Sequence, residues 1–394
     1  MPPPLAGAVM TLDNNPASLA DYQYHQDGPL TLYLGDTQRV LTAMPEASVD
    51  CVVTSPPFWG LRDYGTGRWS GGNPDCPHDA RRRVDGAACR RCPARWSDPQ
   101  YGLEPTLDEY VDRLVDVFRH VRRVLTPTGT CWLNLGDSYS SASGGAPQAG
   151  RPQPGGRRPA RPRAQDTLAP KNLLGVPWRI AFALQTDGWW LRNAIIWSKT
   201  NPMPESVRDR LSTTYELIFL LTPSPIYFFD LDPIRIPLLH PTAADGTRVI
   251  GGTRKGPTGG IGATARRRGA TAYGNKYTFT DTTEPRAAAG NLKPLGHAHT
   301  AAHHRGRNPG DVWRIATRPY RGSHVAPFPI DLPLRAIAAG SPAGGVVLDP
   351  FSGAATTGLA AMQLGRRYIG IDIAARFHDE ALTRLRPHLP PARP

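Results

Sequence analysis

Short apolar runs mark the strands expected in the first part of the chain. Residues 30–34 and 49–53 are rich in Leu and Val and have the length of buried strands. The second run leads directly into Ser-Pro-Pro at 55–57, and two successive prolines allow neither a helix nor a strand ladder to continue. We therefore expect the loop TSPPFWG, residues 54–60, at the carboxyl end of a strand.

A helical period begins after Thr106. Thr106 and Glu109 have the spacing of a capping box, and the apolar residues that follow fall on one helical face. These apolar residues are Tyr110, Val111, Leu114, Val117, Phe118 and Val121. Residues 127–129, Pro-Thr-Gly, predict a turn into a strand at 131–135. Strand, helix, turn and strand in this order predict a parallel sheet with crossover helices.

Regular patterns return in the middle of the chain and near its C-terminus. In the middle they predict a helix at 173–184 and strands at 190–197 and 215–221. Near the C-terminus they predict a βαβα unit, with strands at 346–348 and 368–373 and helices at 356–364 and 374–385. The expected fold class is α/β with a mostly parallel sheet.

Two stretches lack such patterns and are basic. Residues 143–170 are rich in Gly, Pro and Arg, which predicts a flexible loop. Residues 240–310 hold eleven Lys or Arg against three acids and so carry +8 of the chain's net charge of +13. This excess, with a sequence pI near 9.8, favours a polyanionic partner such as nucleic acid.

The cysteines and the N-terminus indicate where the protein works. The N-terminal residues do not follow the pattern of a secretory signal, and no apolar run has the length of a membrane span. Five cysteines, an odd number, argue against a disulfide framework. We expect a soluble, cytoplasmic (intracellular) protein with no membrane partner.

The C-terminal unit has the pattern of a nucleoside site. Its first strand ends in Asp349, Gly353 follows in a turn of small residues, and a helix begins at Thr356. The next strand ends in Asp372, whose carboxylate could accept hydrogen bonds from ribose hydroxyls. The turn lacks GxGxxG, which counts against a nicotinamide or flavin site. An ordinary strand-to-helix turn is the structural alternative.

Here the sequence resembles a known family. DPFSGAATT, from residue 349, is similar to the cofactor motif DPFxGxGTT of the site-specific DNA amino-methyltransferases, and SPPF at 55–58 fits their catalytic motif (D/N/S)-P-P-(Y/F/W). Further blocks appear in family order, among them GDTQRV at 35–40, WLNLGDSY at 132–139, IIWSKTNPMPES at 195–206 and HVAPFPIDLP at 324–333. The catalytic motif precedes the cofactor motif, as in the beta arrangement of the family.

The resemblance implies a Rossmann-like methyltransferase fold that binds S-adenosylmethionine. It implies cofactor contacts from Asp36, Asp349, Pro350, Phe351, Gly353, Thr356, Thr357, Asp372, His324 and Phe328. Asp372 would hold the ribose, and the backbone around Gly353 would face the methionine part. Ala355 replaces the last Gly of the family motif, and we expect its methyl group to be tolerated. For His324 a structural role is the alternative.

The same family places the catalytic chemistry on Ser55, Pro56, Pro57 and Phe58. An exocyclic amino group is a poor nucleophile because its lone pair is delocalised into the base. Ser55 and the Pro56 carbonyl offer two hydrogen-bond acceptors that would localise this pair, and Phe58 offers a stacking face for a base flipped out of the duplex. The chain has no Pro-Cys dipeptide, which counts against a thiolate nucleophile and 5-methylcytosine chemistry. A proline turn after a strand is the structural alternative.

Three cysteines and a histidine follow this loop with the spacing of a metal site. Cys76, His78, Cys89 and Cys92 could form a Cys3His zinc site that orders an insertion too polar to have its own core. Only one residue separates the first two ligands, which is tighter than usual. Free surface thiols and a chance histidine are the alternative. A closed four-ligand site would be structural.

We therefore expect three functional regions. Residues 25–239 form the catalytic part, with the zinc insertion at 70–97 and the flexible loop at 143–170. Residues 240–310 form a basic target-recognition insertion, in which Arg266, Arg267, Arg268 and Lys276 are the candidate DNA contacts and a solvated basic loop is the alternative. Residues 311–390 form the cofactor part. Asn201, Pro204 and Glu205 are expected to shape the loop beside the target base, where a role in turn geometry is equally open.

The expected activity is methylation of cytosine N4 in duplex DNA, because serine at the first motif position resembles the N4-cytosine enzymes. An N6-adenine enzyme of the same architecture is the first alternative. Others are methylation of RNA or of a protein glutamine, and a catalytically silent zinc-dependent DNA-binding protein. A cognate restriction endonuclease is a possible partner. The sequence determines neither the recognition sequence nor the oligomeric state.

Overall fold

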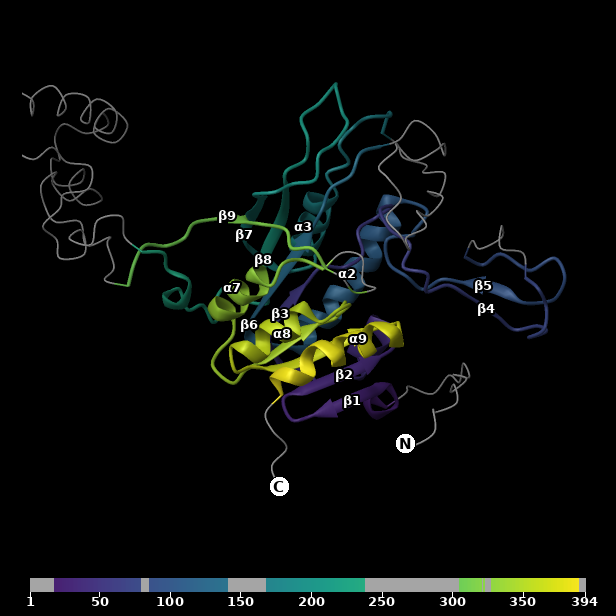
Figure 1. Cartoon of the computed structure of the whole chain (residues 1–394), viewed down its shortest axis with the longest axis horizontal. Coiled ribbons are helices and arrows are strands. Elements are labelled where there is room, and N and C mark those ends of the chain that lie inside the picture. The colour runs from purple at the N-terminus through teal and green to yellow at the C-terminus, as the bar shows by residue number, and fades with distance from the viewer. Residues whose placement is uncertain are drawn as a thin grey trace, which may run out of the picture. The chain divides into compact units, whose positions relative to one another are not determined.

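Apolar strands from both ends of the chain meet in one sheet in the structure, which is a computed structural model (Figure 1). The structure describes residues 18–78, 85–140, 168–237, 305–320, 322 and 327–389. The chain divides into two units, Met1–Asp230 with Asp311–Pro394, and Leu231–Gly310. The sheet and the helices that pack on it belong to the first unit.

Among the described residues, nine strands form this sheet, in the order β1-β2-β11-β10-β3-β6-β8-β7-β9. The strands are β1 (Gln23–Asp27), β2 (Leu30–Leu34), β3 (Val49–Thr54), β6 (Leu125–Leu135), β7 (Trp190–Lys199), β8 (Tyr215–Thr222), β9 (Val312–Ile315), β10 (Val346–Asp349) and β11 (Arg367–Asp372). Strands β2, β11, β10, β3 and β6 run parallel, whereas β1 and β8 are antiparallel to their neighbours. The mostly parallel sheet confirms the predicted fold class.

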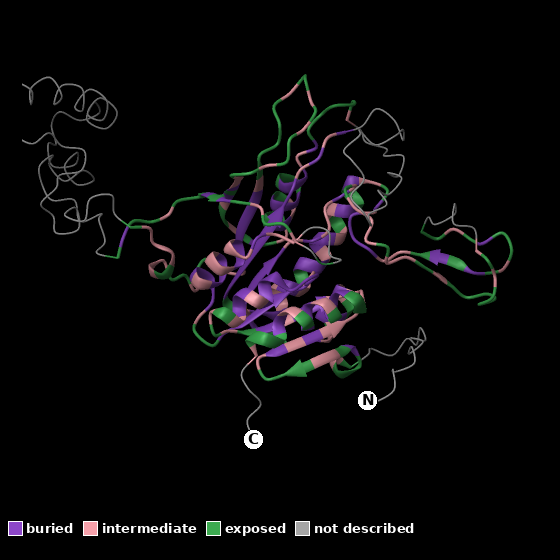
Figure 2. Cartoon of the chain, in the orientation of Figure 1, coloured by how far each residue is buried: buried purple, intermediate pink, exposed green. Residues whose placement is uncertain are grey.

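Helices cover both faces of the sheet. On one face α1 (Thr37–Ala43) packs on α2 (Leu107–Val124), which packs on α3 (Val176–Thr186). On the other face α7 (Asp331–Gly340) packs on α8 (Thr356–Gln363), which packs on α9 (Ala375–Leu385) (Figure 1). Right-handed crossovers from β3 to β6 and from β10 to β11 step in opposite directions along the sheet, so their helices lie on opposite faces. The buried core lies along the central strands (Figure 2).

Helix α2 begins where the sequence predicts it. The Thr106 hydroxyl accepts a hydrogen bond from the Glu109 amide at 3.2 Å, which caps the first turn. The apolar positions predicted to share one face are buried, apart from the half-buried Val111. This face packs on the sheet and carries the buried Tyr110.

Two predicted boundaries are wrong. Residues 127–129 form no turn before a separate strand: they lie within β6, where the pairing with β3 is irregular, so Pro-Thr-Gly makes a bulge. Helix α3 begins at Val176 rather than at 173, because Gly175 has a left-handed φ of 69° and Pro177 occupies the first turn. Leu173 instead bridges to Tyr139.

A small two-stranded sheet, which the pattern did not predict, lies between the catalytic loop and α2. Strands β4 (Arg68–Ser70) and β5 (Arg95–Ser97) pair antiparallel. We call residues 68–97 the arm; residues 79–84 within it lie outside the described residues. Few of its described residues are buried (Figure 2).

Only the ends of the second unit are described, residues 231–237 and 305–310. A short 3-10 helix spans Asp232–Ile234, and Asp232 pairs with Arg235 at 2.6 Å and with Arg305 at 2.9 Å. The residues predicted to contact DNA, Arg266, Arg267, Arg268 and Lys276, lie outside the described residues, so their role stays a prediction. Within the described ranges, no helix has the length and apolar character needed to cross a membrane.

Candidate active site

The two predicted loops leave the same edge of the sheet from neighbouring strands. β3 and β10 pair in parallel, with Cys51 opposite Val347 and Val52 opposite Leu348. The last residues of the two strands are also joined, because the Thr54 hydroxyl donates to the Asp349 carboxylate at 2.7 Å. The predicted catalytic loop, residues 54–60, and the predicted cofactor loop, residues 350–356, therefore begin side by side, although almost three hundred residues separate them in the chain.

The buried carboxylate of Asp349 holds the cofactor loop through hydrogen bonds. Its carboxylate accepts hydrogen bonds from the Thr54 hydroxyl at 2.7 Å, the Thr357 hydroxyl at 2.8 Å and the Phe351 amide at 3.1 Å. The side chain is 2% exposed. Burial raises the pKa of this carboxyl from 3.8 to about 6, and the three hydrogen bonds oppose that rise. Asp349 thus ties the cofactor loop to the catalytic strand.

Asp372 holds the same loop from the next strand and still faces the cleft. Its carboxylate accepts from the Gly353 amide at 2.9 Å and from the Ala374 amide at 2.8 Å. Burial raises the pKa of the Asp372 carboxyl from 3.8 to about 6. Each carboxylate oxygen has a second lone pair, so the group can accept further hydrogen bonds from a ligand in the cleft.

The turn between these acids has strained backbone at one position. Gly353 has a φ of 48°, which glycine adopts without strain. Ala355 has a φ of 52° and precedes the first residue of α8. The methyl group of Ala355 fits, since the residue is fully buried, but a left-handed φ costs an L-residue about 1–2 kcal/mol. The expected tolerance therefore has a cost in the backbone.

One cleft of about 1540 Å³ joins both loops. Of the predicted site residues it is lined by Asp36, Ser55, Pro56, Pro57, Phe58, Phe328, Asp349, Pro350, Phe351, Thr356 and Asp372. Gly353 and the fully buried Thr357 support the loop from behind the lining. Asp36 also caps α1, where its carboxylate accepts from the Arg39 amide at 3.1 Å. His324 lies outside the described residues.

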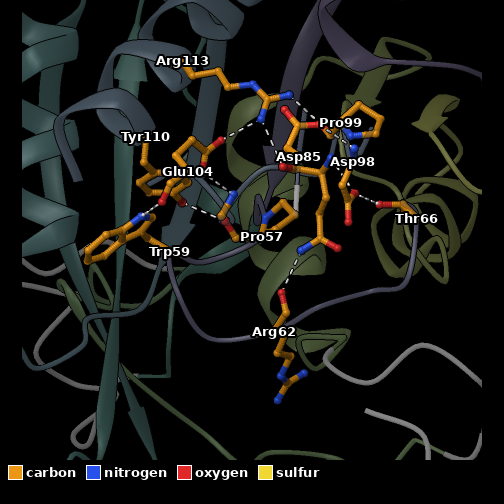
Figure 3. Close-up of polar contacts among 12 residues, drawn as sticks. Pro57, Trp59, Arg62, Thr66, Asp85, Asp98, Pro99, Glu104, Tyr110 and Arg113 are labelled. Carbon is orange, nitrogen blue, oxygen red and sulfur yellow. Dashed lines mark hydrogen bonds and ion pairs between the residues drawn. The ribbon is translucent and has the colours of Figure 1, made fainter. Parts of the chain in front are cut away.

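The proline segment of the catalytic loop is held through a carbonyl group. Pro56 and Pro57 have no N–H, so the backbone of these two residues can be held only through its C=O groups. The Tyr110 hydroxyl donates to the Pro57 carbonyl at 2.8 Å, and Tyr110 is fully buried (Figure 3). Pro57's carbonyl is therefore engaged inside the protein.

The Phe58 ring packs closely against the backbone of Gly136. A Cβ atom added at Gly136 would lie 2.6 Å from the Phe58 ring, so only glycine permits this contact. Gly136 follows β6, the strand next to β3. The WLNLGDSY block thus supplies the surface on which the Phe58 ring rests.

Residues 98–104 also bind the catalytic loop (Figure 3). The Gly60 amide donates to the Gly102 carbonyl at 2.8 Å, and the Trp59 ring nitrogen donates to the Glu104 carbonyl at 3.0 Å. The Glu104 carboxylate accepts from the Gly102 amide at 2.7 Å and pairs with Arg113 of α2 at 2.8 Å. The sequence patterns predicted neither these contacts nor the Tyr110 hydrogen bond. For the latter, a tyrosine on the apolar face of α2 was the one available sign, because a buried hydroxyl needs a partner.

A second polar group lines the cleft at the ends of β6, β7 and β8. Lys199 pairs with Glu216 at 2.6 Å, and the Asn134 amide donates to the same carboxylate at 3.1 Å. The side chains of Lys199 and Glu216 are only 21% and 17% exposed. An ion pair this far from bulk solvent keeps the Lys199 ammonium beside the cleft, where its remaining N–H groups can donate to a ligand.

The loop around residues 201–205 has the structural role considered for it. Asn201 accepts from the Thr317 amide at 2.7 Å and donates to the Thr317 carbonyl at 3.0 Å, which fixes the chain after β9. Glu205 pairs with Arg210 at 2.6 Å and lines the cleft. A contact of this loop with a target base stays a prediction.

The four predicted metal ligands come together in the arm. Their ligand atoms all lie within 4.8 Å of one another. Cys89 Sγ lies 4.0 Å from Cys76 Sγ and 3.4 Å from His78 Nδ1, and Cys92 Sγ lies 3.6 Å from His78 Nδ1. Tetrahedral zinc with Zn–S of about 2.3 Å and Zn–N of about 2.0 Å requires about 3.8 Å between sulfurs and about 3.5 Å from sulfur to nitrogen. The donor set and its spacing therefore fit zinc.

A family model and two relatives of known name all identify the chain as similar to DNA methyltransferases. A family model described as DNA methylase, of the N6/N4 type, matches residues 49–383. The type II methyltransferase M.Cfr9I of Citrobacter freundii is 33% identical over 366 residues, which cover 92% of this chain and 91% of the relative. The type II methyltransferase M.XycI of Xanthomonas campestris pv. cyanopsidis is 35% identical over 355 residues, covering 90% and 87%.

Among solved structures, the PvuII DNA methyltransferase, which its name describes as cytosine-N4-specific, superposes with a TM-score of 0.51. The match covers 93% of this chain and 88% of the other at 15% identity. This likeness supports the fold.

Proposed function

The chain belongs to the N6/N4 DNA methylase family, and from that premise we propose that it transfers the methyl group of S-adenosylmethionine to N4 of cytosine in duplex DNA. One observation carries the proposal: the cofactor loop and Ser-Pro-Pro-Phe open into one cleft and are joined by the Thr54–Asp349 hydrogen bond of 2.7 Å. A pocket for one small ligand encloses about 300–1,000 Å³. The cleft, at about 1540 Å³, has room for a cofactor and a flipped base.

Each loop has a separate task in this proposal. S-adenosylmethionine supplies, when bound, an electrophilic methyl group on a sulfonium. Asp372 would accept hydrogen bonds from its ribose, and Phe351, Phe328 and Asp36 would line its pocket. Asp349 acts as a positioning residue, because its carboxylate is engaged by Thr54, Thr357 and the Phe351 amide.

On the base side, Ser55 and the Pro56 carbonyl would accept hydrogen bonds from the target amino group and localise its lone pair on nitrogen. No described hydrogen bond engages the Pro56 carbonyl, whereas Tyr110 holds that of Pro57. Phe58, resting on Gly136, would stack on the flipped base.

Lys199 supports cytosine over adenine as the target. Cytosine has an acceptor, O2, beside its ring nitrogen N3, whereas adenine has a C–H group at the corresponding place. A lysine ammonium held against Glu216 in the cleft matches the first edge better than the second. Serine at position 55 points the same way through the family resemblance.

The test is to digest DNA methylated by the protein and to resolve its nucleosides by mass spectrometry. We expect N4-methylcytosine; N6-methyladenine alone would refute the choice of base. Sequencing of DNA from expressing cells, with modification detection, gives the recognition sequence. Parallel transfer assays on DNA, RNA and protein would expose either alternative substrate, and absence of cofactor binding in calorimetry would favour a catalytically silent DNA-binding protein.

The Lys199 assignment has its own test. Lys199→Met should lower kcat/KM for DNA by about ten-fold or more, as expected for one lost charged hydrogen bond, while cofactor affinity stays unchanged. Lys171→Met is the matched control, because Lys171 also lines the cleft but pairs with Asp209 while 81% exposed. Equal kinetics of the two variants would remove Lys199 from base recognition.

We also propose that Cys76, His78, Cys89 and Cys92 hold a structural zinc ion. The four ligands would close the coordination sphere, so the metal would order the arm and take no part in the reaction. Elemental analysis of the purified protein should find one zinc per chain, and Cys89→Ser should lose it. Wild-type protein without zinc would refute the assignment.

Two further parts of the proposal concern partners. Residues 240–310 would supply target recognition, with Arg266, Arg267, Arg268 and Lys276 as DNA contacts. The relatives named above are type II methyltransferases, which supports a cognate restriction endonuclease as partner.

A further inference from the structure

The arm leaves the body of the protein at the rim of the cleft. The cleft lining includes Leu61, Arg62, Tyr64 and Thr66 before the arm and residues 99–101 after it. The two sides are tied together, because the Gln100 side chain accepts from the Tyr64 amide at 2.7 Å and donates to the Arg62 carbonyl at 2.8 Å. The Thr66 hydroxyl also donates to Asp98 at 2.7 Å (Figure 3). The root of the arm therefore borders the cleft.

The arm presents positive charge that its own acids do not neutralise. Its sequence has seven arginines and three aspartates, of which Arg81, Arg82, Arg83 and Asp79 lie outside the described residues. Arg68, Arg90, Arg91 and Arg95 are exposed. None of the ion pairs between described residues involves these four, and the hydrogen bonds that the guanidinium groups of Arg91 and Arg95 donate go to backbone carbonyls.

Two of these arginines lie between ligands of the proposed zinc site. Arg90 and Arg91 lie between Cys89 and Cys92, and the Arg91 amide donates to Cys89 Sγ at 3.4 Å. Trp69 stacks on the ligand His78, with ring centroids 4.9 Å apart. A cation carried by a rigid turn loses less conformational entropy on binding than one on a free loop. A zinc ion on these ligands would therefore hold the backbone that carries Arg90 and Arg91, whose exposed guanidinium groups could meet an anionic partner.

We propose that the arm is a second DNA-contacting surface, which grips the phosphate backbone beside the base-flipping cleft through Arg90 and Arg91. This inference rests on the proposed DNA methylation. Guanidinium groups bind phosphate through paired N–H donors, and such contacts position a duplex without reading its sequence. The arm thus contributes affinity and register, and it leaves sequence recognition to other residues.

The test measures DNA affinity over a range of salt. A labelled duplex that contains the recognition sequence is titrated with wild type and with Arg90→Ala/Arg91→Ala from about 50 mM to about 200 mM salt. We expect the double variant to bind about ten-fold more weakly at the low end, and its slope of log affinity against log salt to be shallower by about 1–2, since each phosphate contact contributes about 0.9. Cofactor affinity and zinc content should stay unchanged.

Two further variants make the result decisive. Arg367→Ala/Arg386→Ala is the matched control, because both arginines are exposed and outside the described ion pairs. Arg367 begins β11, at the end of the strand opposite the cleft. Arg90→Lys/Arg91→Lys keeps the charge and should keep most of the affinity and the slope. If the alanine variant were to lose zinc, the lysine variant would decide, because a loss equal to that of alanine would overturn a charge-based contact.

The outcomes separate this inference from the proposed function. If wild type methylates DNA and the alanine variant retains affinity and slope, the arm is no DNA contact and serves another partner, such as a protein. If wild type transfers no methyl group to DNA at all, the proposed function fails first, and the salt titration then shows whether the arm binds DNA independently of any reaction.

Discussion

The catalytic loop and the cofactor loop begin side by side but are held in opposite ways. The cofactor loop is held by its amides: the carboxylates of Asp349 and Asp372 accept from the N–H groups of Phe351 and Gly353. The catalytic loop has two prolines at its centre and so lacks those N–H groups. At this centre it is held by a carbonyl instead, through the Tyr110 hydroxyl on Pro57, and an amide donates only at the end of the loop, from Gly60 to the Gly102 carbonyl.

The difference decides where each support comes from. A carboxylate that grips amides can stand within the motif itself, as Asp349 does. A carbonyl needs a donor, and the loop finds it on α2, 53 residues further along the chain. The cofactor loop is therefore largely a local structure, and the catalytic loop depends on residues 98–113. Substitutions in the two systems should accordingly separate cofactor binding from turnover.

The largest effect is expected at the catalytic loop. Ser55→Ala removes an acceptor for the amino group and should lower kcat by about 100-fold or more, the size of effect seen when one preorganised polar group is lost. Phe58→Ala should cost about 10–100-fold, because stacking on a base is worth about 1–3 kcal/mol. Single-turnover assays measure both. Calorimetry should find cofactor affinity unchanged, and full activity in either variant would refute its role.

Asp372→Asn should act on the other side of the comparison. Loss of hydrogen bonds to a charged acceptor costs about 1.5–3 kcal/mol, so cofactor affinity should fall about 10–100-fold while kcat at saturating cofactor changes far less. Calorimetry and a cofactor titration of the rate check this. A fall in kcat at unchanged affinity would place Asp372 in the reaction instead.

The same carboxyl predicts a pH dependence. Burial raises the pKa of Asp372 from 3.8 to about 6, so the uncharged form prevails in the free protein below that pH. Ribose hydroxyls that donate to the carboxylate favour its ionised form, so cofactor affinity should fall as the pH drops through about 6, with proton release on binding there. Calorimetry in buffers of different ionisation enthalpy measures the release.

The contribution of Asp372 to folding stability has the opposite pH dependence. The native state holds the Asp372 proton more tightly than the unfolded chain, so this carboxyl favours the folded state at low pH and that contribution is lost as the pH rises from about 4 to about 6. Burial raises the pKa of Asp349 to about 6 as well. Asp372→Asn should abolish the pH dependence of cofactor binding, and a dependence that survives would belong to Asp349.

A smaller effect is expected from removing single hydroxyl groups. Tyr110→Phe leaves the Pro57 carbonyl without its donor, at a cost of about 1–3 kcal/mol for a buried unsatisfied acceptor, and should lower kcat about ten-fold with unchanged cofactor KM. Tyr368→Phe is the matched variant, because its hydroxyl lies 2.8 Å from Ser352 in the cofactor loop. It should raise the cofactor KM instead. An identical response of the two variants would refute the prediction that the two loops act separately on turnover and on cofactor binding.

The smallest effect is expected at Ala355. Ala355→Gly relieves the left-handed φ of 52° and should raise the free energy of unfolding by about 1 kcal/mol, the strain regained less the extra flexibility of glycine in the unfolded chain. Urea denaturation with an unchanged m-value measures it. Ala354→Gly is the control: it has no positive φ and should lose stability.

The sequence predicted what is encoded locally. Asp349, Gly353 and Asp372 fall within one βαβ unit, and strand, turn and helix patterns suffice to place them. The metal cluster was also predicted, because its four ligands lie within 17 residues. The bulge at 127–129 was not, since Pro-Thr-Gly is as typical of a turn as of an irregular strand.

Supports that join distant parts of the chain could not be predicted. Tyr110 counted as one apolar position among several on α2, and only the packed structure shows its hydroxyl meeting Pro57. The Lys199–Glu216 pair depends on β7 and β8 lying antiparallel, which the periodicity of neither strand specifies. Such contacts depend on which strands become neighbours, and that is decided by the whole fold.

The root of the arm also bears on how such a chain can change. Because Thr66 meets Asp98 and Gln100 meets Tyr64, the ends of the intervening segment are already closed upon each other, and the length of what lies between them adds little to the entropy of closure. Residues 68–97 therefore behave as an exchangeable cassette: a segment of another length or charge could be grafted at this point without displacing the loop at Ser55.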